Sequence, residues 1–319
     1  MSIHNNTLRL KGLKAIAEAL PDFTYGDYSV SENEAGGETY DVKIMTDNPL
    51  EKLFDGDASD VEELNLHNIR FLKEYAFNQT RWQLKRFYAP KLEIIGLGAF
   101  YYSQVEFTEL PDSVTRIEGN AFFKCTKLSL TKLPSNIEYV GYNAFDSCPN
   151  VSFLDLPESL ITLGSRAFAY TDVQFKKLPS KLTRIENDTF MQCSGIEIES
   201  IHDNITSIGN QAFYACTKMP LKYISKNLKS IGMSAFSSCY SITALDLPEK
   251  LSTINSNAFE HCDNLVSVVF RGKPSSIAST AFSQCKSLTS IKVPWSEGQV
   301  ANTPWGATNA VITYNYTGE

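Results

Sequence analysis

The sequence of 319 residues lacks both a long apolar run and an excess of basic side chains. A membrane-spanning helix needs about 18 consecutive apolar residues. Polar side chains (His4–Thr7) stand where the apolar part of a secretory signal would lie. The formal net charge of −7 argues against sequence-independent binding to nucleic acid, which needs a basic surface. We therefore expect a soluble chain that is cytoplasmic at synthesis, with no signal peptide, no membrane insertion and no nucleic-acid partner.

The residue patterns of catalytic and metal sites are also absent from the sequence. No Cys-x-x-Cys pair is present to indicate a zinc site, and Gly96-Leu97-Gly98 lacks the third glycine of a dinucleotide-binding loop. The four histidines are too far apart in the sequence to predict a catalytic or metal-ligating cluster: His4, His67, His202 and His261. We predict a protein that is not an enzyme, with no catalytic residues, no metal site and no cofactor.

The dominant feature of the sequence is an internal repeat marked by the dipeptide Ala-Phe. Its phenylalanines recur every 22 or 23 residues, and one unit has Thr189-Phe190 instead: Phe77, Phe100, Phe122, Phe145, Phe168, Phe190, Phe213, Phe236, Phe259 and Phe282. A fixed period of this length is typical of a stacked array in which each unit forms one coil. Ten units run from about residue 62 to about residue 293.

Other apolar residues keep the same register in each unit. Five residues before each phenylalanine stands Leu, Ile or Val: Leu72, Ile95, Ile117, Val140, Leu163, Ile185, Ile208, Ile231, Ile254 and Ile277. After the phenylalanine comes a β-prone segment that often ends in proline, which marks the end of a strand because it cannot donate to a sheet ladder. We predict a repeat solenoid of about ten coils, with a parallel β-sheet on one face and a short helical turn around each Ala-Phe on the other.

The pattern Leu-Pro-x-x-(Leu/Ile/Val)-x-x-Ile-Gly-x-x-Ala-Phe-x-x-Cys-x-x-(Leu/Ile), clearest at residues 133–151, resembles that of the BspA-like leucine-rich-repeat proteins. The resemblance covers about 230 residues and implies a leucine-rich-repeat fold. Members are mostly bacterial and protist surface proteins, so it also implies adhesion to host proteins or to other cells. Residues 293–316 resemble the carboxyl ends of repeat proteins encoded among phage and prophage tail genes, which implies a virion-associated location.

The seven cysteines all stand three residues after a repeat phenylalanine: Cys125, Cys148, Cys193, Cys216, Cys239, Cys262 and Cys285. Thr80, Ser103 and Thr171 fill this position in the other units. A position shared by Cys, Ser and Thr indicates an interior ladder of small side chains, because free cysteine behaves as a small buried hydrophobe. A disulfide between neighbouring rungs is the alternative, since the rung spacing does not exclude one.

The sequence divides into residues 1–61, the solenoid of residues 62–293, and residues 294–319. Residues 1–61 do not repeat, and they are either a cap that shields the first coil or an attachment or oligomerisation element. Residues 294–319 contain Trp295 and Trp305. We predict that this segment is a C-terminal cap, which seals the last coil with large apolar area.

A binding function would reside on the strand face of the solenoid. The residue before each strand-ending apolar position is expected to point outward: Glu109, Lys132, Asp155, Lys177, Ser200, Tyr223, Asp246, Val269 and Lys292. From this row we predict ligand-binding roles for Lys132, Asp155, Lys177, Tyr223 and Asp246, with Tyr223 the only aromatic residue in the row. The leading hypothesis is a non-enzymatic binding module that adheres to or recognises a surface protein or glycan. The alternative is a structural component of a larger assembly such as a phage tail, whose partners are other virion or surface-assembly proteins.

Overall fold

The computed structural model describes residues 28–32, 38–42, 61–66, 70–72, 74–78 and 85–318. Most of the predicted N-terminal region, residues 1–61, lies outside the described residues, so its role as a cap or attachment element stays a prediction. The chain divides into two compact units, Met1–Ser152 and Phe153–Glu319.

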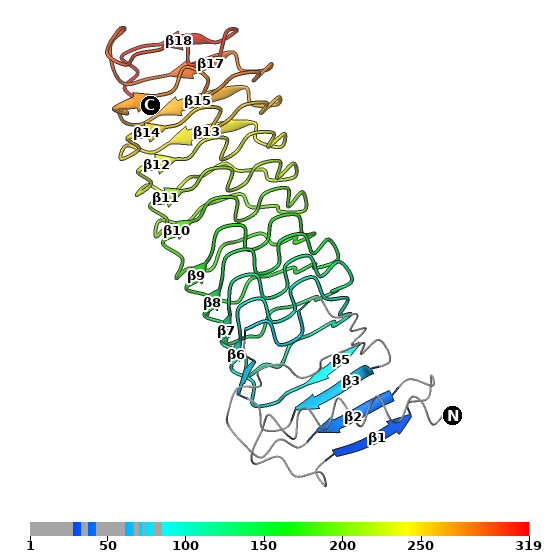
Figure 1. The fold of residues 1–319 in the computed structure, drawn as a ribbon. Helices are drawn as coiled ribbons and strands as arrows, with labels where there is room; N and C mark the ends of the chain where they lie inside the picture. Colours follow the sequence, from blue (N-terminus) through cyan, green and yellow to red (C-terminus); the bar gives the residue numbers. More distant parts are fainter. Residues whose placement is uncertain are drawn as a thin grey trace. The chain divides into compact units, whose positions relative to one another are not determined.

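Four strands form a mixed sheet at the beginning of the first unit (Figure 1). β1 (Tyr28–Glu32) pairs antiparallel with β2 (Glu38–Val42), and β2 pairs in parallel with β3 (Val61–Leu66). β3 pairs in parallel with β5 (Arg86–Tyr88), which lies inside the predicted repeat region. Residues on both sides of the predicted boundary at 61–62 therefore share one sheet.

Each coil carries a two-residue strand at the fifth and sixth positions before the repeat phenylalanine. In the first unit these are β4 (Phe71–Leu72), β6 (Ile94–Ile95), β7 (Arg116–Ile117) and β8 (Tyr139–Val140). In the second they are β9 (Thr162–Leu163), β10 (Arg184–Ile185), β11 (Ser207–Ile208), β12 (Ser230–Ile231), β14 (Thr253–Ile254) and β16 (Ser276–Ile277). Figure 1 shows β10, β11 and β12 stacked in sequence order, and they pair in parallel. The second residue of every strand is buried, which confirms the apolar register predicted from the sequence.

A second ladder follows the repeat phenylalanine, where the sequence predicts a strand in every coil. It is formed by β13 (Ala244–Leu247), β15 (Ser267–Phe270), β17 (Ser290–Lys292) and β18 (Val311–Thr313) of the second unit. Between residues 108 and 177 this segment forms no strand. There the N–H of Ser129 donates to the carbonyl of Phe107, 22 residues earlier. The N–H of Thr131 donates to the carbonyl of Thr108, 23 residues earlier. This one-residue shift in register interrupts the ladder, so the predicted sheet is only partly present.

The Ala-Phe segments form turns instead of the predicted helical turns, and the described residues contain neither a helix nor a candidate membrane-spanning segment. Asn120 and Lys124, two residues before and after Phe122, have positive φ angles of 55° and 57°. A right-handed helix needs negative φ at every successive residue, so it cannot extend through these positions. The N–H of Phe122 donates instead to the carbonyl of Ala144 in the next coil at 2.8 Å. The prediction of helical turns was wrong because stacking provides the hydrogen bonds that a helix would supply.

The repeat phenylalanines form the centre of each unit, and all of them are fully buried. In the first unit the rings of Phe77, Phe100 and Phe122 stack nearly parallel, with centroids 4.9 and 5.0 Å apart. In the second unit the stack from Phe190 to Phe282 has centroid spacings of 5.3–5.5 Å. These contacts hold each coil to the next, because a single coil cannot bury its own apolar edge.

The seven cysteines form the predicted interior ladder, and all are buried free thiols. Each thiol donates to the main-chain carbonyl of the phenylalanine one coil earlier, at Sγ···O distances of 2.9–3.2 Å. The alternative of disulfides between neighbouring rungs is therefore not realised in the structure. Burial raises the pKa of the Cys239 thiol from its usual value of 9.0 to about 12, which keeps this rung in the protonated, donating form.

The C-terminal segment continues the stack with a further partial coil. β18 pairs in parallel with β17, and the N–H of Phe282 donates to the carbonyl of Trp305 at 2.9 Å. Trp305 is fully buried, and its ring centroid lies 6.3 Å from that of Trp295 and 6.0 Å from that of Phe270. These contacts are consistent with the C-terminal cap predicted for residues 294–319. The capping role itself stays a prediction.

Candidate binding groove

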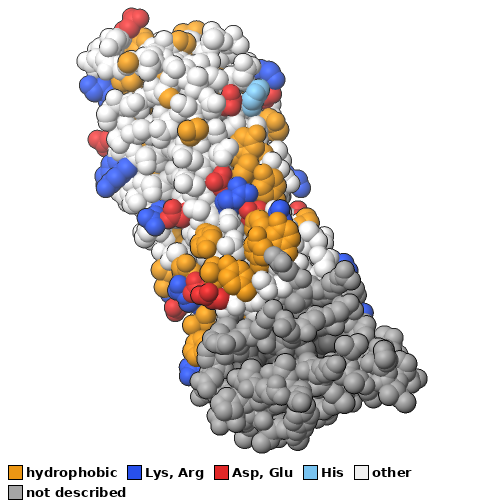
Figure 2. Space-filling view, viewed as in Figure 1, with side chains coloured by type: hydrophobic (Ala, Val, Ile, Leu, Met, Phe, Trp, Pro, Cys, Tyr) orange, Lys and Arg blue, Asp and Glu red, His pale blue; other side chains and the backbone are white. Residues whose placement is uncertain are grey.

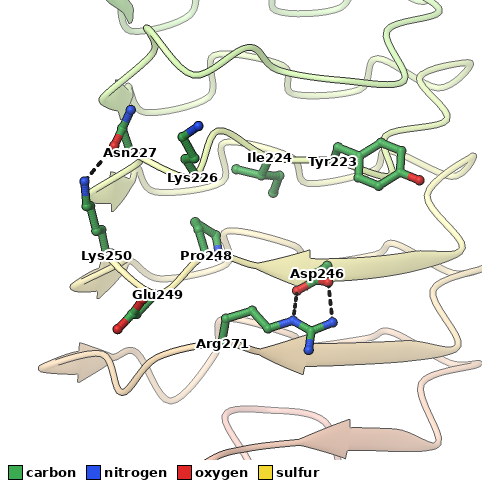
Figure 3. A pocket seen from close by; sticks show the side chains of 9 residues that line it. All are labelled: Tyr223, Ile224, Lys226, Asn227, Asp246, Pro248, Glu249, Lys250 and Arg271. Carbon is green, nitrogen blue, oxygen red and sulfur yellow. Dashed lines mark hydrogen bonds and ion pairs between the residues drawn. The ribbon is translucent and has the colours of Figure 1, made fainter. Parts of the chain in front are cut away.

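The structure brings two of the five predicted ligand-binding residues together. Tyr223 and Asp246 are direct neighbours through a parallel bridge between adjoining coils, and both line one groove (Figure 3). Asp155 and Lys177 are exposed on earlier coils of the second unit. Lys132 is exposed in the first unit. The predicted row is therefore a surface feature of both units, and only part of it forms a concave site.

The groove has a volume of about 430 Å³ and crosses neighbouring coils near the end of the second unit. It is lined by Tyr223, Ile224, Lys226, Asn227, Asp246, Pro248, Glu249, Lys250 and Arg271. Ile224 and Pro248 are buried, whereas the side chain of Tyr223 is 66% exposed. Most lining residues come from the turn just after the strand row, so coil stacking sets the spacing between them.

Hydrogen bonds between coils hold the polar side chains of the groove in place. Arg271 donates to both carboxylate oxygens of Asp246, at 2.7 Å from Nε and 2.6 Å from Nη2. Lys250 Nζ donates to Asn227 Oδ1 at 2.8 Å. Asn227 Nδ2 in turn donates to the main-chain carbonyl of Asp203 at 2.9 Å. Because a two-point arginine–carboxylate pair fixes orientation as well as distance, the groove presents polar groups in defined positions.

Pairing favours the charged forms of Arg271 and Lys226 in the groove and of Asp203 beside it. The hydrogen bond to Asp246 raises the pKa of Arg271. Beside the groove, the ammonium of Lys226 lies 2.8 Å from Asp203; this contact lowers the pKa of Asp203 and raises that of Lys226. General acid–base catalysis needs a pKa near the working pH, and these shifts run the other way. No group of three His, Cys, Asp or Glu side chains in the described part of the chain could hold a metal ion.

Two of the three remaining predicted residues, Lys132 and Lys177, take part in exposed ion pairs. Lys132 lies 3.3 Å from Glu109, and Lys177 lies 3.1 Å from Glu158. The main-chain N–H of Ser180 is the largest cause of the lowered pKa of Glu158, about 2. Exposed pairs of this kind contribute little to stability. The ligand-binding roles predicted for these positions therefore stay predictions.

Sequence reasoning missed Arg271, Asn227 and Lys250 as groove residues. Arg271 stands where the coils on either side have Pro248 and Pro294, so the interruption of the proline pattern was a usable signal. Asn227 and Lys250 show no such interruption. Their contact depends on the offset between adjacent coils, which a sequence does not specify.

The first unit carries a further aromatic residue on the strand row. Tyr88 of β5 stands one coil before Glu109, is 52% exposed, and lines a smaller groove of about 330 Å³. Tyr223 is the one aromatic residue among the nine predicted outward positions, and Tyr88 adds a second exposed tyrosine at the corresponding position one coil earlier. The predicted row began one coil too late.

Exposed aromatic side chains also gather on the turns of the first unit. Tyr75, Tyr102 and Tyr142 are 40%, 42% and 47% exposed, and Tyr101 stacks on Phe123 with ring centroids 5.3 Å apart. Figure 2 shows hydrophobic side chains gathered among charged ones on one face of the molecule. The doublet Tyr101-Tyr102 was the sequence signal for this cluster, which lies outside the predicted binding row.

Solved structures of bacterial leucine-rich repeat proteins resemble this chain. A leucine rich cell surface protein from Faecalibacterium prausnitzii is 22% identical, with 87% of this chain and 96% of that one covered and a TM-score of 0.42. A leucine-rich repeat protein from Bacteroides ovatus is 19% identical, with coverage of 92% and 99% and a TM-score of 0.46. The pneumococcal vaccine antigen PcpA is 17% identical, with coverage of 90% and 96% and a TM-score of 0.43.

Curated protein sequences include no significant match to this chain. The family described as the BspA type leucine rich repeat region matches residues 70–197 and 196–303, in six copies. These two ranges contain nearly all of the repeat units, including the groove. The chain thus belongs to the BspA-type leucine-rich repeat family.

Proposed function

We propose that this chain is a non-enzymatic binding module that recognises a surface protein or glycan through the groove at Tyr223. The observation that carries the proposal is an exposed tyrosine beside polar groups held by hydrogen bonds between coils. Tyrosine offers a large contact area with few rotatable bonds, and it is enriched among residues that dominate binding energy. Polar groups that are already ordered lose little entropy when a ligand binds. Such a module would act at a cell or virion surface, as the family resemblance and the tail-gene resemblance imply.

Tyr223→Ala tests the proposal in binding to a panel of purified host-surface proteins and glycans. We expect the affinity for whichever ligand binds to fall by more than about 1 kcal/mol. The unfolding midpoint should not change, because the side chain is exposed. Tyr240→Ala is the matched control, since Tyr240 is also exposed, at 41%, but does not line the groove.

An assembly role predicts a different outcome. If the solenoid is a spacer in a larger structure, Tyr223→Ala has no effect on binding. Deletion of residues 1–61 or 294–319 then abolishes assembly. That result would replace the groove with the two ends as the functional regions.

A further inference from the structure

The charges of the groove are balanced. Its three basic side chains are Lys226, Lys250 and Arg271, and its acidic ones are Asp246 and Glu249, with Asp203 paired to Lys226 beside it. An anionic ligand on Arg271 would have to displace the two-point contact with Asp246. The Nε and Nη2 donors of Arg271 are already used by Asp246, so Arg271 does not offer them to an added anion. The groove therefore does not favour a charged ligand of either sign.

Residues with charged or amide side chains outnumber apolar ones in the groove, although most of the surface that they present to it is carbon. Of its nine lining residues only Tyr223, Ile224 and Pro248 are apolar or aromatic. Charged residues are depleted from the centre of protein interfaces, where the dominant contacts are desolvated. A partner that brings its own hydroxyl groups suits this lining better.

The groove offers both donors and acceptors. The carboxylate of Asp246 accepts from Arg271 and has further lone pairs, and the ammonium of Lys250 uses one of its three N–H donors on Asn227. Neighbouring sugar hydroxyls each donate and accept, so they can bond to both kinds of group without adding charge. Polar groups set among carbon-rich surfaces thus match a polyhydroxylated ligand, whose rings carry both hydroxyl and C–H groups.

The ring of Tyr223 provides the remaining element of sugar recognition. No other ring or cation lies against it among the described residues, and two-thirds of the side chain is exposed. An aromatic ring has an electron-rich face that attracts polarised C–H groups, and a pyranose ring presents such groups on one side. We propose that the groove binds a neutral glycan, with one sugar ring on Tyr223 next to Asp246 and a further sugar of the same chain beside Lys250. This inference rests on the proposed function of the groove.

The experiment titrates the full chain with maltohexaose, cellohexaose, mannohexaose and chitohexaose, and with dextran sulfate as the anionic probe. We expect at least one neutral hexasaccharide to bind by calorimetry, with an affinity that does not change between low and high NaCl. Tyr223→Ala should weaken that binding at least about tenfold, whereas Tyr223→Phe should retain it because the ring is kept. Tyr240→Ala should leave the affinity unchanged.

Failure of the glycan inference and failure of the groove give different results. Absence of binding to all four neutral probes overturns the inference, as does salt-sensitive binding to dextran sulfate alone. If a surface protein then binds and Tyr223→Ala weakens that complex, the groove is still a binding site and only the ligand class is wrong. If a neutral probe binds equally to wild type and Tyr223→Ala, the site itself is wrong and both proposals fail.

Discussion

The position three residues after each repeat phenylalanine shows how one environment accepts three side chains. Cysteine there donates to the carbonyl of the previous coil, as from Cys125 to Phe100 at 2.9 Å. The hydroxyl of Thr171 donates within its own coil to the carbonyl of Phe168 at 2.7 Å. Ser103 is fully buried, but its hydroxyl has no hydrogen-bond partner among the described residues. Serine is therefore the least satisfied of the three.

Ser103→Cys should raise the free energy of unfolding by roughly 1 kcal/mol, because a buried polar group without a partner costs about that much or more. Thr171→Cys is the control and should give no gain, since its hydroxyl is already bonded. Both variants are measured by denaturant titration. Equal gains at the two positions would show that side-chain volume, and not the unmet hydrogen bond, decides the preference for cysteine.

A second residue-scale prediction concerns alkaline pH. The folded-state pKa of Cys239 lies near 12, above its usual 9.0, so its favourable contribution is complete below pH 9 and is lost as pH rises toward 12. At pH 10 the thiol should cost the wild type roughly 1–2 kcal/mol of stability relative to pH 7. The destabilisation caused by Cys239→Ala should shrink by that amount between the two pH values.

Thr171→Ala provides the comparison for this pH effect, because a hydroxyl does not titrate in the range. Its destabilisation should be the same at both pH values. A Cys239→Ala difference that also stays constant would mean that the thiol ionises in the folded protein.

At the scale of the coil, one coil departs from the regular stack of phenylalanine rings. The centroids of Phe168 and Phe190 are 6.0 Å apart, against 5.5 Å for Phe213 and Phe236. Phe190 belongs to the coil in which Thr189 replaces the usual alanine. The hydroxyl of Thr189 donates to the carbonyl of Glu186 at 2.9 Å. The larger side chain of Thr189 thus coincides with a wider spacing between the rings of Phe168 and Phe190.

Phe213→Ala should therefore lower the free energy of unfolding more than Phe190→Ala. Removing a buried phenylalanine side chain costs roughly 3–5 kcal/mol, and the cost is greater where packing is tighter. Denaturant midpoints of the two variants decide the order. Phe190 also meets Phe175 edge-on at 5.1 Å, so an equal or reversed order would show that this contact compensates for the wider stack.

At the scale of the whole chain, stability depends on how the stack ends. Every internal coil has a neighbour on each side, whereas a terminal coil exposes its apolar edge unless something covers it. Residues 294–318 provide β18 and two buried tryptophans beside Phe270. Phe270 is itself larger than Leu247 at the same position one coil earlier. Phe270 thus offers the two tryptophans a ring to pack against.

Deleting residues 294–319 should cause aggregation or a clear loss of stability, because it exposes the edge beneath Trp305. Removal of residues 317–319 alone is the control and should have no effect, since Thr317 and Gly318 are exposed. Light scattering and denaturant titration measure the two outcomes. A soluble truncated protein with unchanged unfolding would identify the segment as a separate functional tail.

Much of the architecture follows from the 22–23-residue period. It fixes which residues share a position, and from this the buried phenylalanines, the thiol ladder and the outward positions of Tyr223 and Asp246 could be predicted. These predictions hold because each depends only on the register within one coil. Arg271 also interrupts the proline pattern in the sequence. Its pairing with Asp246 could be recognised only in the structure.

Contacts between coils were decided by tertiary structure alone. A lone Ala-Phe segment has no hydrogen-bond partners except its own backbone, so the sequence favoured a helical turn. In the stack the next coil offers its carbonyls, and residues such as Asn120 and Lys124 adopt left-handed conformations instead. The groove arises in the same way, since Asp246 and Arg271 meet across 25 residues of chain. Their meeting depends on the offset between coils, which is set by packing and not by the repeat.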